Sequence, residues 1–215
     1  MTFISLLTSH LSPLYTHPFP PMKKLPPEFY RRPDPVQIAR ELLGKHVFSR
    51  VDGQLTGGRI IETEAYSHLG DDSLTMHLKR LSSASQALRE PGGRAYLYKV
   101  YQRHTLFNIC TNEAGKTDTV LLRAIEPLVG LDVMQERRGA SIKPNRLTAG
   151  PGMLTQALGL TPDLTGTDLQ GGLLWIEDHG EIIPADQILA GPRIGLEYAG
   201  SIAAGLLWNL QINHT

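Results

Sequence analysis

Two glutamates and a tyrosine alternate with smaller or apolar residues over positions 61–66 of the chain. Successive side chains of a strand point to opposite faces, so Glu62, Glu64 and Tyr66 are expected to share one face. A polar, solvated strand surface explains this arrangement, because exposed acids are the norm. A carboxylate held in a pocket would instead act as a general base that takes a proton from a water molecule. The alternation does not choose between Glu62 and Glu64 for that role.

Aromatic side chains are concentrated in residues 94–101, which hold three of the seven tyrosines. Tyr96 and Tyr98 are expected on one strand face, and Tyr101 on the other, beside a turn that carries Arg103. Packing within a sheet explains Tyr96 and Tyr98 equally well, since tyrosine favours strands. Tyr101 is harder to explain in this way, because a bulky ring at such a turn gains little from exposure to solvent. Aromatic rings among cations are typical of surfaces that stack on nucleobases and hold the phosphate backbone.

Arg123 lies in an apolar, strand-like stretch, with Leu121 and Ile125 as neighbours on its own face. A buried charge without a partner costs several kcal/mol, so Arg123 should be paired. Glu62 or Glu64 is the obvious partner. A structural ion pair and a place in an active site are both consistent with this pattern.

Motifs for several other chemistries are absent from the sequence. His68 and His77 are nine residues apart and lack the closely spaced partner ligands of zinc sites, so we expect no metal. The chain has neither a Gly-x-Ser-x-Gly elbow nor a Gly-x-x-x-x-Gly-Lys phosphate loop. The single cysteine, Cys110, excludes an internal disulfide framework, and its apolar neighbours favour a packing role.

The charge is zero overall but unevenly distributed over the 215 residues. Residues 79–123 contain eight Lys or Arg side chains and three acidic ones, which gives that segment a net charge of +5. A local basic stripe can bind phosphates even on a neutral protein. A chance cluster on a solvated surface explains the same counts equally well.

The composition, with 41% hydrophobic and 20% charged residues, is typical of one globular domain. No apolar run reaches the roughly 18 residues of a membrane span. Residues 1–21 lack the positive start and long apolar stretch of a signal peptide, and we expect residues 1–24 to be a disordered extension. The folded domain is expected over 25–215. A lone cysteine suits a reducing compartment, and we expect a cytoplasmic monomer.

The candidate residues require strands that bring them side by side. Residues 46–51 and 54–66 are typical of two strands joined at a turn over 52–53. Further strands are expected over 94–101, 104–111, 118–126 and 173–177.

Helices are expected from Asp34, with Pro35 in its first turn, to Gly44, over 128–138, and from Gly150 to Leu158. Residues 67–93 are mostly polar and are expected to form a long loop with room for one helical turn over 84–89. Strands that come in adjacent pairs, rather than alternating with helices, favour an α+β fold with a largely antiparallel sheet.

Several short segments, in this order and spacing, resemble the alkyladenine (3-methyladenine) DNA glycosylases, the eukaryotic-type enzymes also found in bacteria. The resemblance covers nearly everything from Leu25 to about Gly200. The matching segments are residues 25–30, 38–44, 58–66, the tyrosine-rich pair of strands with Asn108, 121–127, 150–154 and 192–195.

The resemblance implies a single α+β domain with a curved, largely antiparallel sheet, flanking helices, a protruding β-hairpin, and no metal or cofactor. It assigns the catalytic acid to Glu64 rather than Glu62 and places Arg123 beside it. Such enzymes act on double-stranded DNA and flip an alkylated or deaminated purine out of the helix before cleaving its N-glycosidic bond. No lysine is placed as a nucleophile, so hydrolysis alone is expected.

The same resemblance assigns binding residues. The pocket for the flipped base is expected to be formed by Tyr66, His77 and Tyr98, with Asn108 disfavouring the exocyclic amine of guanine. Tyr101 is expected to fill the vacated space in the helix. The remaining DNA contacts are expected from Lys99, Arg94 and Arg103.

This chain departs from the family at several positions. Relatives usually carry basic residues where residues 82–86 are Ser-Ser-Ala-Ser-Gln, and a lysine where Met153 stands, so fewer phosphate contacts are expected. His68 is a rival for the place of His77. Two other functions remain open: a nucleic-acid-binding module of this fold without catalysis, and a carbohydrate hydrolase that uses Glu62 and Glu64 as a pair.

Overall fold

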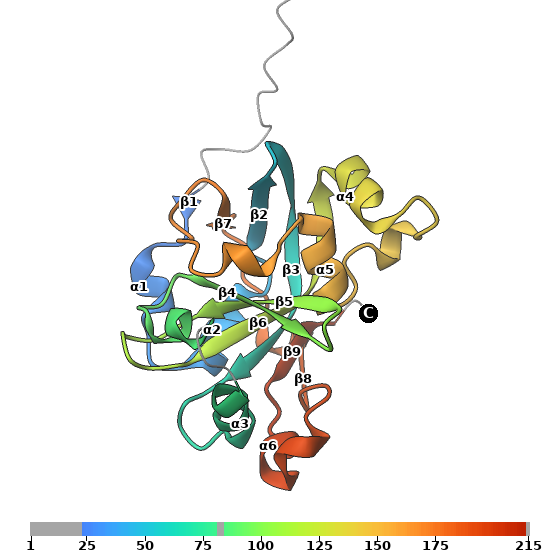
Figure 1. Cartoon of the computed structure of the whole chain (residues 1–215). Coiled ribbons are helices and arrows are strands. Elements are labelled where there is room, and N and C mark those ends of the chain that lie inside the picture. The colour runs from blue at the N-terminus through green and yellow to red at the C-terminus, as the bar shows by residue number, and fades with distance from the viewer. Residues whose placement is uncertain (1–22, 81–83, 214–215) are drawn as a thin grey trace, which may run out of the picture.

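The structure is a computed structural model that describes residues 23–80 and 84–213. It is an α+β domain built on one curled sheet (Figure 1), in which every strand pair is antiparallel. The expected α+β class with a curved antiparallel sheet is confirmed, whereas the protrusion of a β-hairpin remains a prediction. The strands are β1 (Lys23–Lys24), β2 (His46–Val51), β3 (Gln54–Tyr66), β4 (Ala95–Val100), β5 (His104–Cys110), β6 (Thr119–Val129), β7 (Leu174–Asp178), β8 (Ile188–Gly191) and β9 (Asn209–Ile212).

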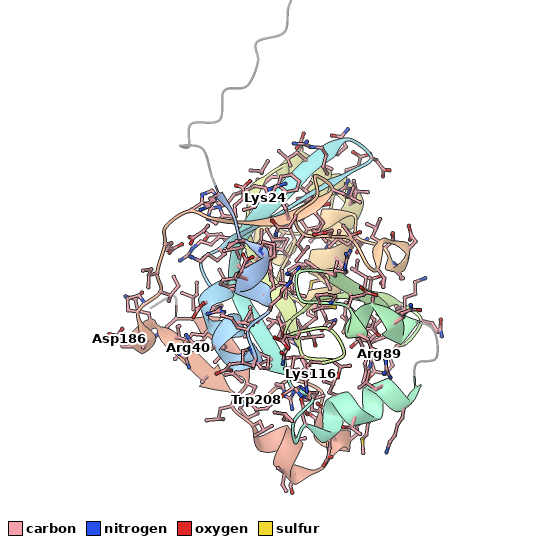
Figure 2. All side chains as sticks on the ribbon, turned by 90° about the vertical axis from the view of Figure 1, so that its left-hand side faces the viewer. Lys24, Arg40, Arg89, Lys116, Asp186 and Trp208 are labelled. Carbon is pink, nitrogen blue, oxygen red and sulfur yellow. The ribbon has the colours of Figure 1, made fainter. Side chains whose placement is uncertain are left out.

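The helices flank this sheet. They are α1 (Pro27–Tyr30), α2 (Pro35–Leu42), α3 (Asp72–Arg80), α4 (Leu131–Arg138), α5 (Pro151–Leu158) and α6 (Ser201–Gly205), with short 3-10 turns that include η1 (Ala84–Arg89) and η5 (Glu197–Ala199). Asp34 caps α2 as expected, because its side chain accepts hydrogen bonds from the amides of Val36 and Gln37. In both views α3 and α6 lie at the lower end of the molecule (Figures 1 and 2).

The sheet order is β1-β7-β2-β3-β6-β5-β4, and β3 is its longest strand. One side of β3 pairs with β6. The other side pairs first with β2 and then, over Glu62 to Glu64, with β9. The part of β3 that carries Glu62 and Glu64 is therefore bordered by a strand from near the C-terminal end of the chain.

Alternation along the strands separates a core face from a polar and aromatic face. On β3 the hydroxyl of Thr63 donates to the carbonyl of Ala39 in α2, 3.0 Å away, which places Thr63 on the core face. Glu62 and Glu64 therefore point to the opposite face. The side chains that pack in the main core from the neighbouring strands are Ala95, Leu97, Phe107, Ile109, Val120 and Leu122.

The turn between β4 and β5 has unusual backbone angles. Tyr101 and Gln102 have φ values of 50° and 55°, and the amide of Arg103 donates to the carbonyl of Val100. Residues other than glycine avoid this left-handed region, because adopting it costs roughly 1 kcal/mol of conformational free energy per residue. The two strands thus form the expected pair around residues 102–103, and the turn carries Tyr101 at its start.

Three expectations for the elements were wrong. Residues 72–80 form helix α3 rather than part of a loop: Asp71 caps it, and Leu74 and Leu78 lie one helical turn apart. β6 does not end at Glu126 but runs to Val129, and α4 starts at Leu131 rather than at residue 128. Gly130, with φ of 70°, separates the two.

Two strands near the C-terminus, β8 and β9, were not expected from the sequence. The helical turn over 84–89 is present as η1. At the other end Lys23 and Lys24, which the sequence assigned to the extension, pair with β7 as β1. Residues 1–22 lie outside the described part of the chain, and the expectation of a disordered extension remains a prediction for them.

No helix of the described residues is long and apolar enough to cross a membrane. The single cysteine, Cys110, is buried with Tyr96 and Leu88, in agreement with a packing role, and burial raises the pKa of its thiol to about 12.

Candidate active site

A cavity of about 610 Å³ opens on the polar and aromatic face of the sheet. Strands β3 to β6 form its floor, α3 and residues 194–198 border it, and the start of α5 reaches its edge. Most of the site residues expected from the sequence meet here. They are Glu64, Tyr66, His77, Tyr98, Lys99, Tyr101, Asn108 and Arg123.

Glu64 is fully buried, and both of its carboxylate oxygens are held by hydrogen bonds. Oε1 accepts from the backbone amide of Ile194 (2.8 Å) and from the side-chain amide of Asn209 (3.1 Å). Oε2 accepts from the hydroxyl of Tyr66 at 2.9 Å. The carboxylate therefore has a fixed orientation and faces the cavity that it lines.

Arg123 pairs with both candidate glutamates. Its Nε lies 2.8 Å from Oε1 of Glu62, and its Nη1 lies 3.2 Å from Oε1 of Glu64. Burial by itself lowers the pKa of Arg123, but the attraction of Glu64 and Glu62 outweighs this and raises the pKa. The expectation that one of the two acids would be its partner holds for both.

Glu62 differs from Glu64 in its surroundings. Its side chain retains 19% of its exposure, whereas that of Glu64 retains none. Glu62 shares Arg123 and the amide of Asn209 but does not line the cavity. Among the described residues around this cavity, Glu64 is the only one with a carboxylate.

Aromatic rings form one wall of the cavity. Tyr98 stacks on Tyr96 with the ring centres 5.1 Å apart, and His77 lies 4.4 Å from Tyr98. Nε2 of His77 is 3.0 Å from the hydroxyl of Tyr96. Burial raises the pKa of each of these two phenols, so both are neutral near pH 7.

His77 rather than His68 therefore lines the cavity. Nδ1 of His68 lies 2.7 Å from Oδ1 of Asp118, whose side chain is fully buried. That pair lies outside the residues that form the cavity. Helix α3, which the sequence did not predict, is the element that carries His77 into place.

Asn108 lies in the floor of the cavity and is only 4% exposed. Its side-chain nitrogen has no hydrogen-bond partner among the described residues. An unpaired buried donor is costly, which makes this nitrogen a candidate donor to an acceptor on a bound molecule.

The cations expected to contact DNA are dispersed. Lys99 lines the cavity, as does Tyr101, which is 90% exposed. Arg103 is exposed on the same turn. Arg94 lies elsewhere: it donates to the carbonyl of Gly166, and its Nη2 is 3.9 Å from Asp168.

Two residues of the site were given no role in the sequence analysis. Asn209 donates to both Glu62 and Glu64, yet it lies beyond the segments on which the resemblance in the sequence rested. Arg193 is buried and precedes the amide that binds Glu64. The segment 192–195 did match the family, so a signal for Arg193 was present in the sequence.

Sequence comparison assigns the chain to the DNA glycosylases, which are hydrolases of N-glycosyl bonds: a family model described as methylpurine-DNA glycosylase matches residues 28–215. The chain belongs to the methylpurine-DNA glycosylase family. The resemblance found in the sequence is thereby confirmed.

Relatives from all three domains of life support this assignment. A protein of Chlorobaculum parvum, named as a 3-methyladenine DNA glycosylase, is 44% identical over 178 residues, which cover 81% of this chain and 82% of the relative. A protein of Methanoculleus marisnigri with the same name is 40% identical over 181 residues, which cover 83% of this chain and 91% of the relative. A protein of Encephalitozoon cuniculi, named as a DNA-3-methyladenine glycosylase, is 37% identical over 166 residues, which cover 76% of this chain and 78% of the relative.

Proposed function

We propose that this protein removes alkylated or deaminated purines from double-stranded DNA, and that Glu64 activates the water that cleaves the N-glycosidic bond. The observation that carries the proposal is a single fully buried carboxylate, held at both oxygens, that lines an aromatic cavity. The relatives named as 3-methyladenine DNA glycosylases support the substrate class.

The proposed hydrolysis needs one group that can take a proton. Glu64 accepts the proton of a water molecule as the water oxygen bonds to the anomeric carbon, and the bonding electrons leave with the purine. Oε1 is occupied by donors from Ile194, Asn209 and Arg123, whereas Oε2 accepts one hydrogen bond, from Tyr66. A carboxylate oxygen has room for a second donor, so Oε2 is the oxygen that we assign to the water.

The aromatic wall suits the proposed substrates. Alkylated purines are often cationic, and a cation over an aromatic face gains roughly 0.5–2 kcal/mol. The rings of Tyr98 and His77 offer such faces within the cavity, and Tyr66 lies beside Glu64. A positively charged base is also a good leaving group, which reduces what the protein must contribute to the bond cleavage.

A base must leave the double helix to reach this cavity, because Glu64 is fully buried. Tyr101 is the candidate for the side chain that occupies the vacated space. Tyr101 is 90% exposed at the cavity edge, on a turn whose left-handed residues are not glycines. Backbone strain of this kind is concentrated at functional sites.

A carbohydrate hydrolase is a poorer match for the cavity. Most such enzymes place two carboxyl groups on either side of the bond that they break. Glu62 is paired with Arg123 and Asn209 outside the cavity, so it is not available as the second group.

The experiment that tests the function uses duplexes with one hypoxanthine, ethenoadenine or 3-methyladenine each. We expect release of the free base from at least one of them, and none from the undamaged duplex, measured by chromatography and by strand cleavage at the abasic site. Binding to lesion duplexes without release from any of them would favour the alternative, a nucleic-acid-binding module of this fold without catalysis.

A further inference from the structure

Beyond the residues that touch the base or the water, the structure assigns a positioning role to one buried cation. We propose that Arg193 orients the carboxylate of Glu64 by positioning the donors that bind the two carboxylate oxygens, without itself contacting the DNA. Arg193 is 3% exposed and does not line the cavity. The inference rests on the proposed function, since it concerns the base that activates water.

The first link runs through the backbone to Oε1 of Glu64. The residue after Arg193 is Ile194, whose amide donates to Oε1 at 2.8 Å. Both ends of the forked Arg193 side chain are fixed: Nη1 donates to the carbonyl of Ala65 (2.9 Å), and Nη2 donates to that of Ala203 (3.2 Å). Holding the side chain in this way restricts the peptide that follows it.

The second link runs through an aromatic ring to Oε2. The guanidinium carbon of Arg193 lies over the Tyr66 ring, 4.6 Å from its centre. The hydroxyl of that ring donates to Oε2 of Glu64 at 2.9 Å. Because burial and the charge of Glu64 raise the pKa of Tyr66, the hydroxyl keeps its proton as a donor. Moving the guanidinium therefore shifts a ring whose far end holds the catalytic carboxylate.

A buried carboxylate holds the guanidinium itself. Arg193 makes two hydrogen bonds to Asp71, Nη1 to Oδ2 at 2.6 Å and Nη2 to Oδ1 at 2.9 Å, and both side chains are fully buried. Burial by itself raises the pKa of Asp71, but the hydrogen bonds from Arg193 and Ser73 outweigh this and lower it. Asp71 thus remains an anion inside the protein.

Asp71 also links this pair to the base-binding wall. It accepts from the amide of Ser73 at 3.1 Å and so caps α3, the helix that carries His77. On the other side the guanidinium carbon of Arg193 lies over the ring of Trp208, 5.0 Å from its centre. Trp208 is the residue that precedes Asn209 in the chain. Trp208 lies towards the lower end of the molecule, above α6 (Figure 2). Arg193 is therefore the common contact of β3, α6, the cap of α3 and the residue before β9.

The chemistry of this pair favours a role in geometry over one in stability alone. A buried ion pair loses the hydration of both charges, and hydrophobic side chains of similar volume often serve stability equally well. A planar cation with several fixed donors instead defines the angles between the groups that it joins. The groups joined here are two of the donors to Glu64, Ile194 and Tyr66, and the cap of the helix that bears His77.

The test replaces Arg193 by lysine, which keeps the charge but cannot bridge both oxygens of Asp71, bind two carbonyls and cover the Tyr66 ring. We expect the single-turnover rate of hypoxanthine release to fall about tenfold or more, since small misplacements of reacting groups are costly. The Kd for the same duplex, measured in the Glu64→Gln background, should change by less than about threefold.

A double-mutant cycle separates positioning from general loosening. If Arg193 acts through the Tyr66 hydroxyl, the rate losses of Arg193→Lys and Tyr66→Phe will not be additive. The matched control is Arg59→Lys. Arg59 lies in β3, outside the cavity, and its guanidinium makes two hydrogen bonds to Glu181, at 2.8 and 2.5 Å, which the lysine cannot reproduce. We expect it to leave the rate within about threefold of the unaltered protein.

Folding of each variant is checked by circular dichroism. Should Arg193→Lys not fold, Asp71→Asn keeps the size of the side chain, removes the charge that holds the guanidinium, and should lower the rate in the same direction. A rate unchanged in a folded variant, or a loss shared by Arg59→Lys, would overturn this inference alone. No base release by the unaltered protein would overturn the proposed function as well.

Discussion

At the scale of single residues, burial separates two glutamates that the sequence makes equivalent. Glu62 and Glu64 share a strand face, an arginine and an asparagine, but only Glu64 is fully buried and lines the cavity. The alternation along β3 correctly predicted the shared face. It could not predict which acid faces the cavity, because that depends on Ile194 and Asn209, which lie at least 130 positions away in the chain.

Asn108 leads to a prediction about substrate choice. Its side-chain nitrogen is a donor without a partner among the described residues and would face the exocyclic amine of a guanine-type base, which is also a donor. We expect Asn108→Ala to reduce the preference for hypoxanthine over 7-methylguanine by about five- to tenfold, as one unfavourable polar contact is removed.

The measurement is competitive base release from duplexes that hold one lesion each. Thr119→Ala, a change in another residue that lines the cavity, serves as the control. An unchanged preference in Asn108→Ala would contradict the role assigned to Asn108.

At the scale of secondary-structure elements, the close contact of β3 and β6 positions Glu64 against Arg123. Gly58 of β3 faces a register shift opposite Pro127, and an added methyl group there would lie 2.2 Å from the carbonyl oxygen of Glu126. We expect Gly58→Ala to lower the free energy of unfolding by about 1–3 kcal/mol, because backbone atoms must move to make room.

Chemical denaturation measures this change. Gly191→Ala, in strand β8, is the matched control, since an added methyl group there meets no atom within 4 Å among the described residues. Equal stability of the two variants would show that the β3–β6 contact is looser than described.

The sequence predicted some elements of the site well and missed others for identifiable reasons. The strands β2 to β6 follow from alternation and turn residues, which are local signals. Helix α3 was missed because Gly70-Asp71-Asp72 resembles a turn, although Asp71 and the spacing of Leu74 and Leu78 favour a helix. β9 is only four residues long, and its place beside β3 is set by long-range pairing that no local pattern reveals.

At the scale of the whole molecule, a pH-sensitive contact lies among residues that do not line the cavity. His46 stacks on His179 with the ring centres 3.7 Å apart, next to Phe48. Burial, and next the proximity of His179, lower the pKa of His46 to about 4. The unfolded chain therefore binds a proton at a higher pH, near 6.5, than the folded protein does.

Because protonation of His46 favours the unfolded state, its contribution is fully present above about pH 6.5 and is lost as the pH falls towards 4. We expect a loss on the order of 2–3 kcal/mol over that interval. Denaturant titrations at several pH values measure it, and His46→Gln should flatten the curve between pH 6.5 and 4.5. The same slope in both proteins would contradict this assignment.

The charge pattern at this scale was only partly informative. The net charge of +5 over residues 79–123 suggested a phosphate-binding stripe, and Lys99 and Arg103 do lie near the cavity edge. Arg94, in contrast, contacts Gly166 and Asp168 away from the cavity, and Arg123 neutralises the glutamates. Counting charges along the chain cannot distinguish cations at the cavity edge from cations that are paired elsewhere, since strand pairing decides where each side chain lies.

The central claim is that Glu64, and not its neighbour Glu62, activates the water. The most direct test compares single-turnover base release by Glu64→Gln and Glu62→Gln on one hypoxanthine duplex, with the Kd of each variant measured in parallel. We expect Glu64→Gln to lose about 10²–10⁴-fold in rate with the Kd nearly unchanged, and Glu62→Gln to lose far less. Base release by Glu64→Gln within a few-fold of the unaltered rate, or a larger loss in Glu62→Gln, would contradict this account.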